Sequence, residues 1–236
     1  MKEIESTRLI QSIAPDTKQR ILDTAERLFM ERGFSATSLR EITAEAKVNL
    51  AAVNYHFGSK EALTEAVLTR RLQPLNELRV VELARLSADA GKKGVPIEAI
   101  LTAFISTAFD LDDAPAAGGG VFMRLLGRAV TEPSEQVKNI LQRQYSAMAA
   151  AYKLALMRAL PNLPEEELVW RMQFLFGAIS YTMAGANVMK LVASCELADA
   201  SDRQAVTQRL VAFLTAGLKA PLPLKAASAQ KRRSRK

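Results

Sequence analysis

The chain has 236 residues, of which 49% are hydrophobic and 24% charged, so it can bury a small domain plus a larger one and is not expected to be disordered throughout. No apolar run reaches the roughly 18–20 residues of a membrane span. One cysteine, Cys195, and one histidine, His56, exclude an intramolecular disulfide and argue against a zinc site. We therefore expect a cytoplasmic protein with no signal peptide, metal, cofactor or membrane partner, in which Cys195 is an inert, buried core residue.

The net charge of +7 is concentrated at the C-terminal end. From Pro221 onward the sequence has six basic residues and no acidic one, which leaves the rest of the chain near +1. We expect residues 221–236 to be a disordered basic tail, which either only keeps the protein soluble or adds non-specific phosphate contacts. The high isoelectric point therefore does not by itself indicate a basic face on the folded body.

Helical spacing begins after a loose arm, residues 1–15. A helix is expected from Thr17, because apolar residues then recur on one face. Asp16 is placed to cap its start, and Gly33 to end it. The expected buried stripe of this helix contains Ile21, Leu22, Ala25, Leu28 and Phe29.

Two short helices follow. Ser38 and Glu41 have the spacing of a capping box, which predicts a helix start at Ser38. After a break at residues 47–49, Asn49 is placed to cap a brief helix over residues 50–57, and Gly58 to end it. Three short helices with a tight middle turn predict a helix-turn-helix, in which the brief helix enters the major groove of DNA.

The rest of the sequence is also helical in pattern. Ser59 caps a fourth helix, in which Pro74 should produce a kink or a break. The segment from Phe174 to Met183 is apolar on nearly all sides, which predicts burial on more than one side. A flexible loop is expected over residues 112–120, and helices over residues 97–111, 122–130, 134–160, 165–191 and 202–219. No segment has the two-residue alternation of a strand, so the predicted fold class is all-α.

Several side chains of the predicted reading helix have the chemistry of a DNA contact. Val53 should anchor the helix from beneath with Phe57, which leaves small or polar side chains outward. Ala51 permits a close approach to thymine methyl groups, and Asn54 can pair with an adenine edge or a phosphate. The other candidates are Asn49, Leu50, Tyr55 and His56, with Lys60 as a cation at a helix N-terminus. A packed tyrosine or histidine and a solvated lysine are the plain structural alternatives.

The stretch FSATSLREITAEAKVNLAAVNYHFGSKEAL, from Phe34 to Leu63, and the preceding TKQRILDTAERLFMERG resemble the TetR family of regulators. The resemblance implies a homodimer that binds a palindromic operator and is released, usually as a repressor, when a ligand enters the C-terminal domain. The positions that the family uses at DNA correspond here to Ser38, Leu50, Ala51, Asn54, Tyr55, His56 and Lys60.

Two residues depart from the family pattern. Lys47 stands where the family usually has a glycine in the turn, and Thr43 where a small alanine is usual. A left-handed backbone at Lys47 would cost roughly 1–2 kcal/mol. A phosphate contact from Lys47 could offset that strain, so we include it among the DNA-binding candidates.

The segments GGVFMRLLGRAV (119–130) and LVWRMQFLFGAISYTMAGA (168–186), together with NLAAVNYHFGSK (49–60), resemble the fatty-acid-responsive PsrA-type branch of that family. This resemblance implies a hydrophobic effector such as a long-chain fatty acid or an acyl-CoA. Bulky apolar side chains could line its pocket, and Arg124, Arg128 or Arg171 could meet its anionic group. Plain core packing is the alternative for each. The candidates are Phe104, Phe109, Phe122, Met123, Arg124, Leu126, Tyr152, Trp170, Arg171 and Phe174.

The predicted organisation is an N-terminal helix-turn-helix domain over residues 16–62, followed by a larger helical ligand-binding and dimerisation domain over residues 63–220. The last two helices are the candidates for a four-helix dimer bundle. No phosphate loop, metalloprotease motif or nucleophile elbow is present in the sequence, so an enzyme is not expected. A helical adaptor, or a small-molecule-binding protein without sequence-specific DNA recognition, remains the alternative.

Overall fold

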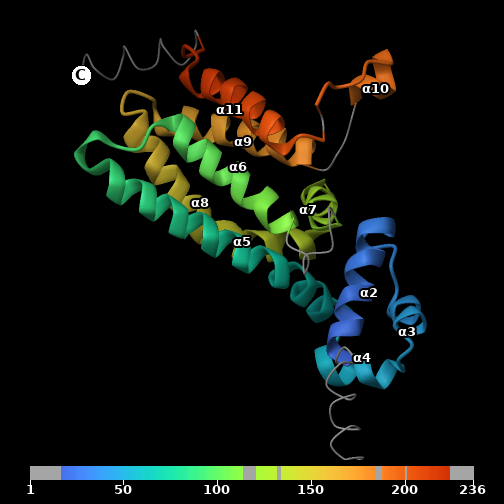
Figure 1. The fold of residues 1–236 in the computed structure, drawn as a ribbon. Helices are drawn as coiled ribbons and strands as arrows, with labels where there is room; N and C mark the ends of the chain where they lie inside the picture. Colours follow the sequence, from blue (N-terminus) through green and yellow to red (C-terminus); the bar gives the residue numbers. More distant parts are fainter. Residues whose placement is uncertain (1–16, 114–120, 132–133, 184–187, 200, 224–236) are drawn as a thin grey trace, which may run out of the picture. The chain divides into compact units, whose positions relative to one another are not determined.

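The computed structural model describes residues 17–113, 121–131, 134–183, 188–199 and 201–223 (Figure 1). Every regular element in these ranges is helical, which confirms the all-α prediction. The elements are α2 (Thr17–Arg32), α3 (Leu39–Ala46), α4 (Leu50–Phe57), α5 (Lys60–Ala90), the 3-10 helix η1 (Gly91–Lys93), α6 (Ile97–Asp113), α7 (Val121–Thr131), α8 (Glu135–Ala159), α9 (Glu165–Met183), α10 (Val188–Ala193) and α11 (Arg203–Lys219).

Some predictions fall on other parts of the chain. The expected arm, Asp16, and most of the expected loop and basic tail lie outside the described residues. Within the described ranges, no helix has the length and apolar character needed to cross a membrane. In the same ranges, no cluster of three or more potential metal ligands occurs.

The chain forms two compact units that interleave along the sequence. Unit 1 contains residues 1–74 and 115–145, and unit 2 contains residues 75–114 and 146–236. Helices α2, α3, α4 and α7 lie in unit 1, whereas α6, α9, α10 and α11 lie in unit 2. The expected assignment of DNA binding to residues 16–62 and ligand binding to residues 63–220 remains a prediction.

Side-chain caps define the short helices. Ser38 Oγ accepts a hydrogen bond from the Glu41 amide at 3.2 Å, and the Glu41 carboxylate accepts one from the Ser38 amide at 2.7 Å. Asn49 Oδ1 accepts the Ala52 amide at 2.8 Å, and Gly58 ends α4 with φ 78°. These are the caps predicted from local sequence, and Ser59 and Asp202 likewise cap α5 and α11.

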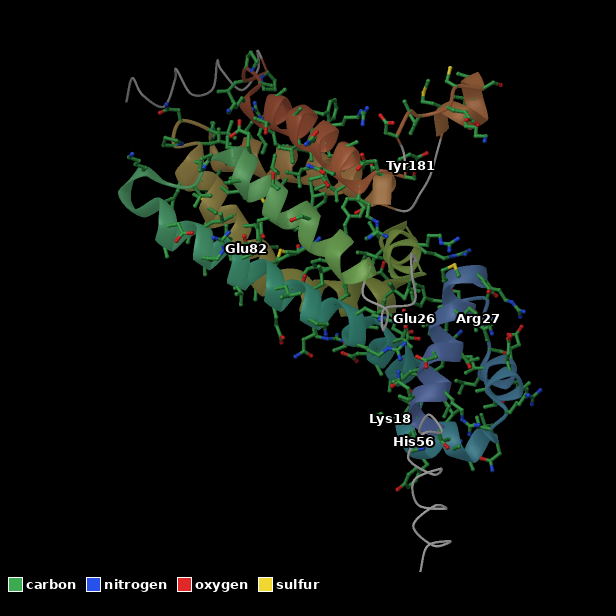
Figure 2. The ribbon with its side chains drawn as sticks, viewed as in Figure 1. Lys18, Glu26, Arg27, His56, Glu82 and Tyr181 are labelled. Atoms are coloured by element: carbon green, nitrogen blue, oxygen red, sulfur yellow. The ribbon has the colours of Figure 1, made fainter. Side chains whose placement is uncertain are left out.

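Helix α2 holds unit 1 together through an apolar stripe and two charged edges. Ile21, Leu28 and Phe29 of the stripe have no solvent exposure. On one edge, the carboxylate of Glu26, 3% exposed, accepts hydrogen bonds from Arg70 and Arg71 of α5. On the other edge, Arg27 pairs with Glu31 of α2 and Glu45 of α3, and Figure 2 shows Glu26 and Arg27 on opposite sides of α2.

Helix α7 completes unit 1. Arg128 Nη1 donates to the carbonyls of Met30 and Glu31 at 2.8 and 3.0 Å, in the last turn of α2. A cation at that position also interacts favourably with the negative end of the helix dipole. Arg128 therefore has a structural role within unit 1.

Unit 2 is centred on a buried arginine. Arg79 of α5 is 2% exposed and stacks its guanidinium 3.7 Å from the ring centroid of Phe104. Its Nε donates to the Phe104 carbonyl at 3.1 Å, and the Tyr152 hydroxyl donates to the Arg79 carbonyl at 3.1 Å. Phe176 packs edge to face on Phe104, with centroids 5.5 Å apart. These contacts join α5, α6, α8 and α9 into one core.

Three expectations about the helices and the cysteine need correction. Of the kink or break expected at Pro74, the break does not occur, because α5 is continuous on both sides of that residue. The neighbouring Leu72 and Leu75 are fully buried, and their packing offsets the backbone hydrogen bond that proline cannot make. The predicted helix over residues 165–191 corresponds to α9 and α10, and the residues between them, 184–187, lie outside the described residues.

Helix α9 is also less buried than predicted. Phe174 is 66% exposed, because only one side of α9 packs within its own chain. Cys195 is exposed rather than buried, because it follows α10 in a segment outside any packed helix stripe.

Candidate nucleic-acid interface

The turn between α3 and α4 depends on one strained residue. Lys47 has φ 54° and ψ 48°, in the left-handed region, as predicted for a position where glycine is usual. Its amide donates to the Ala44 carbonyl at 3.3 Å, and the Val48 amide donates to the Thr43 carbonyl at 3.0 Å. The chain thus reverses over three residues and Asn49 begins α4, which is the geometry of a helix-turn-helix.

Helix α4 is anchored from beneath. Val53 has no solvent exposure, and Phe57 is half-buried rather than fully buried. Phe29 and Phe34, with ring centroids 5.0 Å apart, form part of the core of the same unit. This packing leaves the opposite face of α4 outward.

The outward face of α4 carries most of the predicted DNA-binding residues. Tyr55 is 86% exposed and Leu50 45% exposed, and Asn49, Ala51 and Asn54 are also exposed. An aromatic side chain that packs so little against its own fold is consistent with a contact made outside the chain.

Two of the predicted contacts also have local roles. The Ser38 hydroxyl belongs to the capping box, where it donates to Glu41 Oε2 at 2.8 Å. The side-chain oxygen of Asn49, Oδ1, caps α4, which leaves the side-chain NH₂ group of Asn49 as a donor. His56 is half-buried beside Tyr55, with ring centroids 5.1 Å apart and the rings nearly perpendicular.

In unit 1 some cationic side chains pair with acidic side chains, whereas others have no acidic partner among the described residues. Arg32 pairs with Glu41 at 2.8 Å, and the cations Arg27, Arg70 and Arg71 pair with acids at the edges of α2. For the exposed Lys47 and Arg40, by contrast, the described part of the chain shows no acidic partner. Lys60 Nζ donates to the Ser35 carbonyl, a neutral group, at 3.3 Å. Positive charge without an acidic partner in the described ranges therefore remains at α3 and the turn, and Lys60, beside Glu61, adds a cation at the start of α5.

Arg40 was missed by sequence reasoning. It lies on α3 outside the stripe of Leu39, Ile42 and Ala46, so helical spacing alone could have identified it as an outward cation. What the sequence could not show is which neighbouring arginines are neutralised by acids from other helices.

The predicted ligand-binding residues fall in both units and differ in burial. Phe104 and Tyr152 are core residues of unit 2, and Leu126 is buried in unit 1. Trp170 and Phe174 lie on the exposed side of α9, at 57% and 66% exposure. Arg124 is exposed, Phe109 is half-buried, and the side chains of Phe122 and Met123 lie outside the described residues.

Arg171 has a structural role in unit 2. It is 7% exposed and pairs with Glu167 at 2.9 Å. Its guanidinium also donates to the carbonyls of Leu218 at 2.7 Å, Pro221 at 3.3 Å and Gly217 at 3.4 Å. These carbonyls surround the C-terminal end of α11, so Arg171 joins α9 to α11.

The chain matches two family models and many regulators. Residues 21–67 match the model "Bacterial regulatory proteins, tetR family", and residues 102–217 match "Tetracyclin repressor-like, C-terminal domain". The chain is 43% identical to the probable HTH-type transcriptional regulator YttP of Bacillus subtilis over 53 residues, 22% of this chain and 26% of that protein. It is 38% identical to the HTH-type transcriptional repressor Rv3405c of Mycobacterium tuberculosis over 104 residues, 39% of this chain and 55% of that protein.

Matched stretches therefore span only about a quarter and about half of these curated relatives. The fold is similar over a greater length. The transcriptional regulator FadR from Bacillus subtilis, solved in complex with stearoyl-CoA, superposes with a TM-score of 0.58 at 16% identity, covering 84% of this chain and 97% of that one. Both family models fall on the parts of the chain where the structure shows the helix-turn-helix and the larger helical region. The chain belongs to the TetR family of transcriptional regulators.

Proposed function

We propose that the protein is a ligand-responsive transcriptional regulator that binds a palindromic DNA operator as a homodimer, by default as a repressor. The observation that carries the proposal is the outward face of α4, where Tyr55, Asn54 and Leu50 are exposed above a fully buried Val53. One such helix per protomer would enter successive major grooves about 34–36 Å apart.

The roles proposed for the interface follow from this geometry. Asn54, Leu50 and Ala51 lie where a base edge would come within reach, and Asn54 can pair with adenine. Tyr55, Lys60 and the newly identified Arg40 supply phosphate donors, and a cation at the N-terminus of α5 suits an anion. The fixed caps of α3 and α4 position these groups before DNA is bound.

The test is binding to duplexes selected from a random pool. The variant Tyr55→Phe/Lys60→Ala should bind the selected duplex more weakly and with a lower salt slope, by about 0.9 for each phosphate that a cation no longer neutralises. Lys138→Ala, an exposed lysine of α8 that pairs with Glu135 at 2.6 Å, is the matched control and should bind normally. Selection of no duplex sequence would reject the regulator and favour a helical adaptor.

The dimer is proposed from a stripe on α9. Trp170, Phe174, Gly177 and Tyr181 follow one another at spacings of four, three and four residues and all are exposed. Phe213 of α11 is 71% exposed, and no atom lies within 4 Å of a Cβ added at Gly177. Large exposed aromatic side chains beside an open glycine suit a partner helix that packs closely.

Dimerisation is tested by sedimentation of Phe174→Glu/Phe213→Glu, which should be monomeric. Val81→Glu places the same charge at another exposed apolar residue, 66% exposed on α5, and should stay dimeric. If the double variant remained a dimer, the dimer interface would not include this stripe of α9 and α11. In this proposal Trp170 and Phe174 serve the dimer rather than a ligand pocket.

The effector is proposed to be a long-chain fatty acid or its CoA ester. The support is the likeness of the sequence to the PsrA-type branch and of the fold to a FadR protein solved with stearoyl-CoA. Palmitate or palmitoyl-CoA, added separately to a DNA-binding assay, should release the operator. If neither compound released the operator, the proposal of a lipid effector would be rejected, whereas the proposal of DNA binding would stand.

A further inference from the structure

The segment formed by α10 and the residues that follow it, 188–199, has little packing within its own chain; we call it the α10 arm. Every side chain of the arm that the structure describes is exposed. Three of them are large and apolar, with Met189 43%, Val192 69% and Leu197 52% exposed. Met189 and Val192 are three residues apart in a helix and therefore share one face. The arm thus presents apolar side chains that the described part of its own chain leaves uncovered.

A helix as short as α10 needs a packed face to be stable. It has six residues, whereas isolated helices shorter than about 12–15 residues are marginal in water and most helices in proteins are stabilised by packing of an apolar face. The described side chains of α10 have no such packing. Ser194 and Asp199 add the cost of a left-handed backbone, with φ 53° and 57°. A contact with another molecule would supply the stability that the arm lacks.

Bonds within the arm give it a defined shape. The Cys195 amide donates to the Met189 carbonyl at 3.1 Å, and Cys195 Sγ donates to the Ala193 carbonyl at 3.3 Å. Lys190 Nζ pairs with Glu196 Oε1 at 2.7 Å. These bonds hold the residues after α10 against the end of the helix, so the arm can bind a partner as one unit.

The far end of the arm is tied to a face of α11 that belongs to the proposed dimer surface. Asp199 of the arm pairs with Arg209 of α11 at 3.1 Å. Arg209 and Phe213 are both exposed and are four residues apart, so they share one face of α11. In the chain the arm follows α9, whose last turn contains the exposed Tyr181 (Figure 2). The arm therefore connects the two helices that carry the exposed aromatic side chains of the proposed dimer.

The charges of the arm favour a protein surface as its partner. Lys190 is its one basic residue and pairs with Glu196, and Asp199 pairs with Arg209. DNA and anionic membranes attract segments with several unpaired cations, which the arm does not have. A second copy of this chain, by contrast, offers exposed aromatic side chains on the same two helices that the arm connects.

We propose that the α10 arm packs Met189, Val192 and Leu197 on a second copy of this chain and so extends the dimer surface of α9 and α11. The inference rests on the proposed dimer and deepens it, because it adds a surface that the stripe of α9 does not include. In a two-fold dimer each arm contacts the other protomer, so the contact occurs twice.

Amide hydrogen exchange of the full-length protein tests whether the arm is covered in the dimer. A short helix without a packed face opens readily, so its amides exchange fast unless a partner covers it. The amides of α10 should exchange about tenfold or more slowly in the wild type than in the monomeric variant Phe174→Glu/Phe213→Glu at the same concentration. The amides of η1, residues 91–93, are the internal control and should exchange alike in both proteins.

A variant of the arm tests whether the contact stabilises the dimer. Val192→Glu/Leu197→Glu should raise the dissociation constant of the dimer about tenfold, measured by sedimentation. Because both side chains are exposed in the chain itself, the helix content of this variant should equal that of the wild type. Val81→Glu/Leu78→Glu is the matched control, since these side chains of α5 are 66% and 47% exposed, and it should leave the dissociation constant unchanged.

The outcomes separate this inference from the proposed dimer. A wild type that sediments as a monomer would end both. A dimeric wild type in which the α10 amides exchange as fast as in the monomeric variant would overturn the arm contact alone, as would an arm variant that dimerises as tightly as the wild type. Slow exchange of α10 that appears only after addition of a DNA duplex or of phosphatidylglycerol vesicles would assign the arm to that partner and overturn the contact with a second copy.

Discussion

Replacing Arg171 with methionine tests whether the junction of α9 and α11 depends on one buried cation. The change keeps the apolar stem and removes the guanidinium, which leaves the carbonyls of Leu218, Gly217 and Pro221 without this donor. It also leaves the carboxylate of Glu167, 16% exposed, without its cation. Removing one partner of a buried pair costs about 3–5 kcal/mol, and the partial exposure of Glu167 places the expected loss of stability near 3 kcal/mol.

This destabilisation is measured by urea unfolding at a fixed protein concentration, because dimerisation would make stability concentration-dependent. For a chain of this length it corresponds to a fall in melting temperature of roughly 6–12 °C. The double variant Glu167→Met/Arg171→Met should recover at least half of the stability, because an apolar pair replaces the ion pair without leaving a lone charge. A destabilisation below about 1 kcal/mol for Arg171→Met, or a double variant no more stable than the single one, would refute the reasoning.

The remaining predictions concern the turn, a cap and a buried phenol. Lys47→Gly should raise the free energy of unfolding by about 1 kcal/mol, because glycine adopts φ 54° without the steric cost, and should weaken operator binding in the same samples; equal stability would show that the turn is unstrained. Asn49→Ala should lower the free energy of unfolding by about 1 kcal/mol through removal of the α4 cap, whereas Asn49→Ser should retain most of it. Burial raises the pKa of Tyr152 to about 12, against 10.0 for a free tyrosine, so the folded state holds this proton more tightly than the unfolded state. Its stabilising contribution is therefore complete below pH 10 and lost as the pH rises from 10 to about 12, and an unfolding series in Tyr152→Phe should lack that part of the alkaline decline.

Local sequence determined the framework of the candidate DNA interface. The capping box of Ser38 and Glu41, the Asn49 cap and the glycine at position 58 depend on groups within four residues of one another, so the ends of α3 and α4 could be predicted without a tertiary structure. The outward positions of Tyr55 and Asn54 could be predicted from helical spacing, because Val53 and Phe57 mark the inward face of α4. The left-handed Lys47 followed from its place in the family pattern.

Tertiary packing decided which charged side chains have partners within the fold. The partners of Glu26 lie on α5, 44 and 45 residues away. Arg171 has one local partner, Glu167, but the carbonyls that its guanidinium binds lie beyond residue 216, so no local pattern shows how fully these groups are engaged within the fold. The exposed stripe of α9 likewise depends on which helices meet, as does the continuity of α5 through Pro74. Hydrogen bonds of caps act over one helical turn, whereas burial and ion pairing depend on distances in space between segments that the sequence keeps far apart.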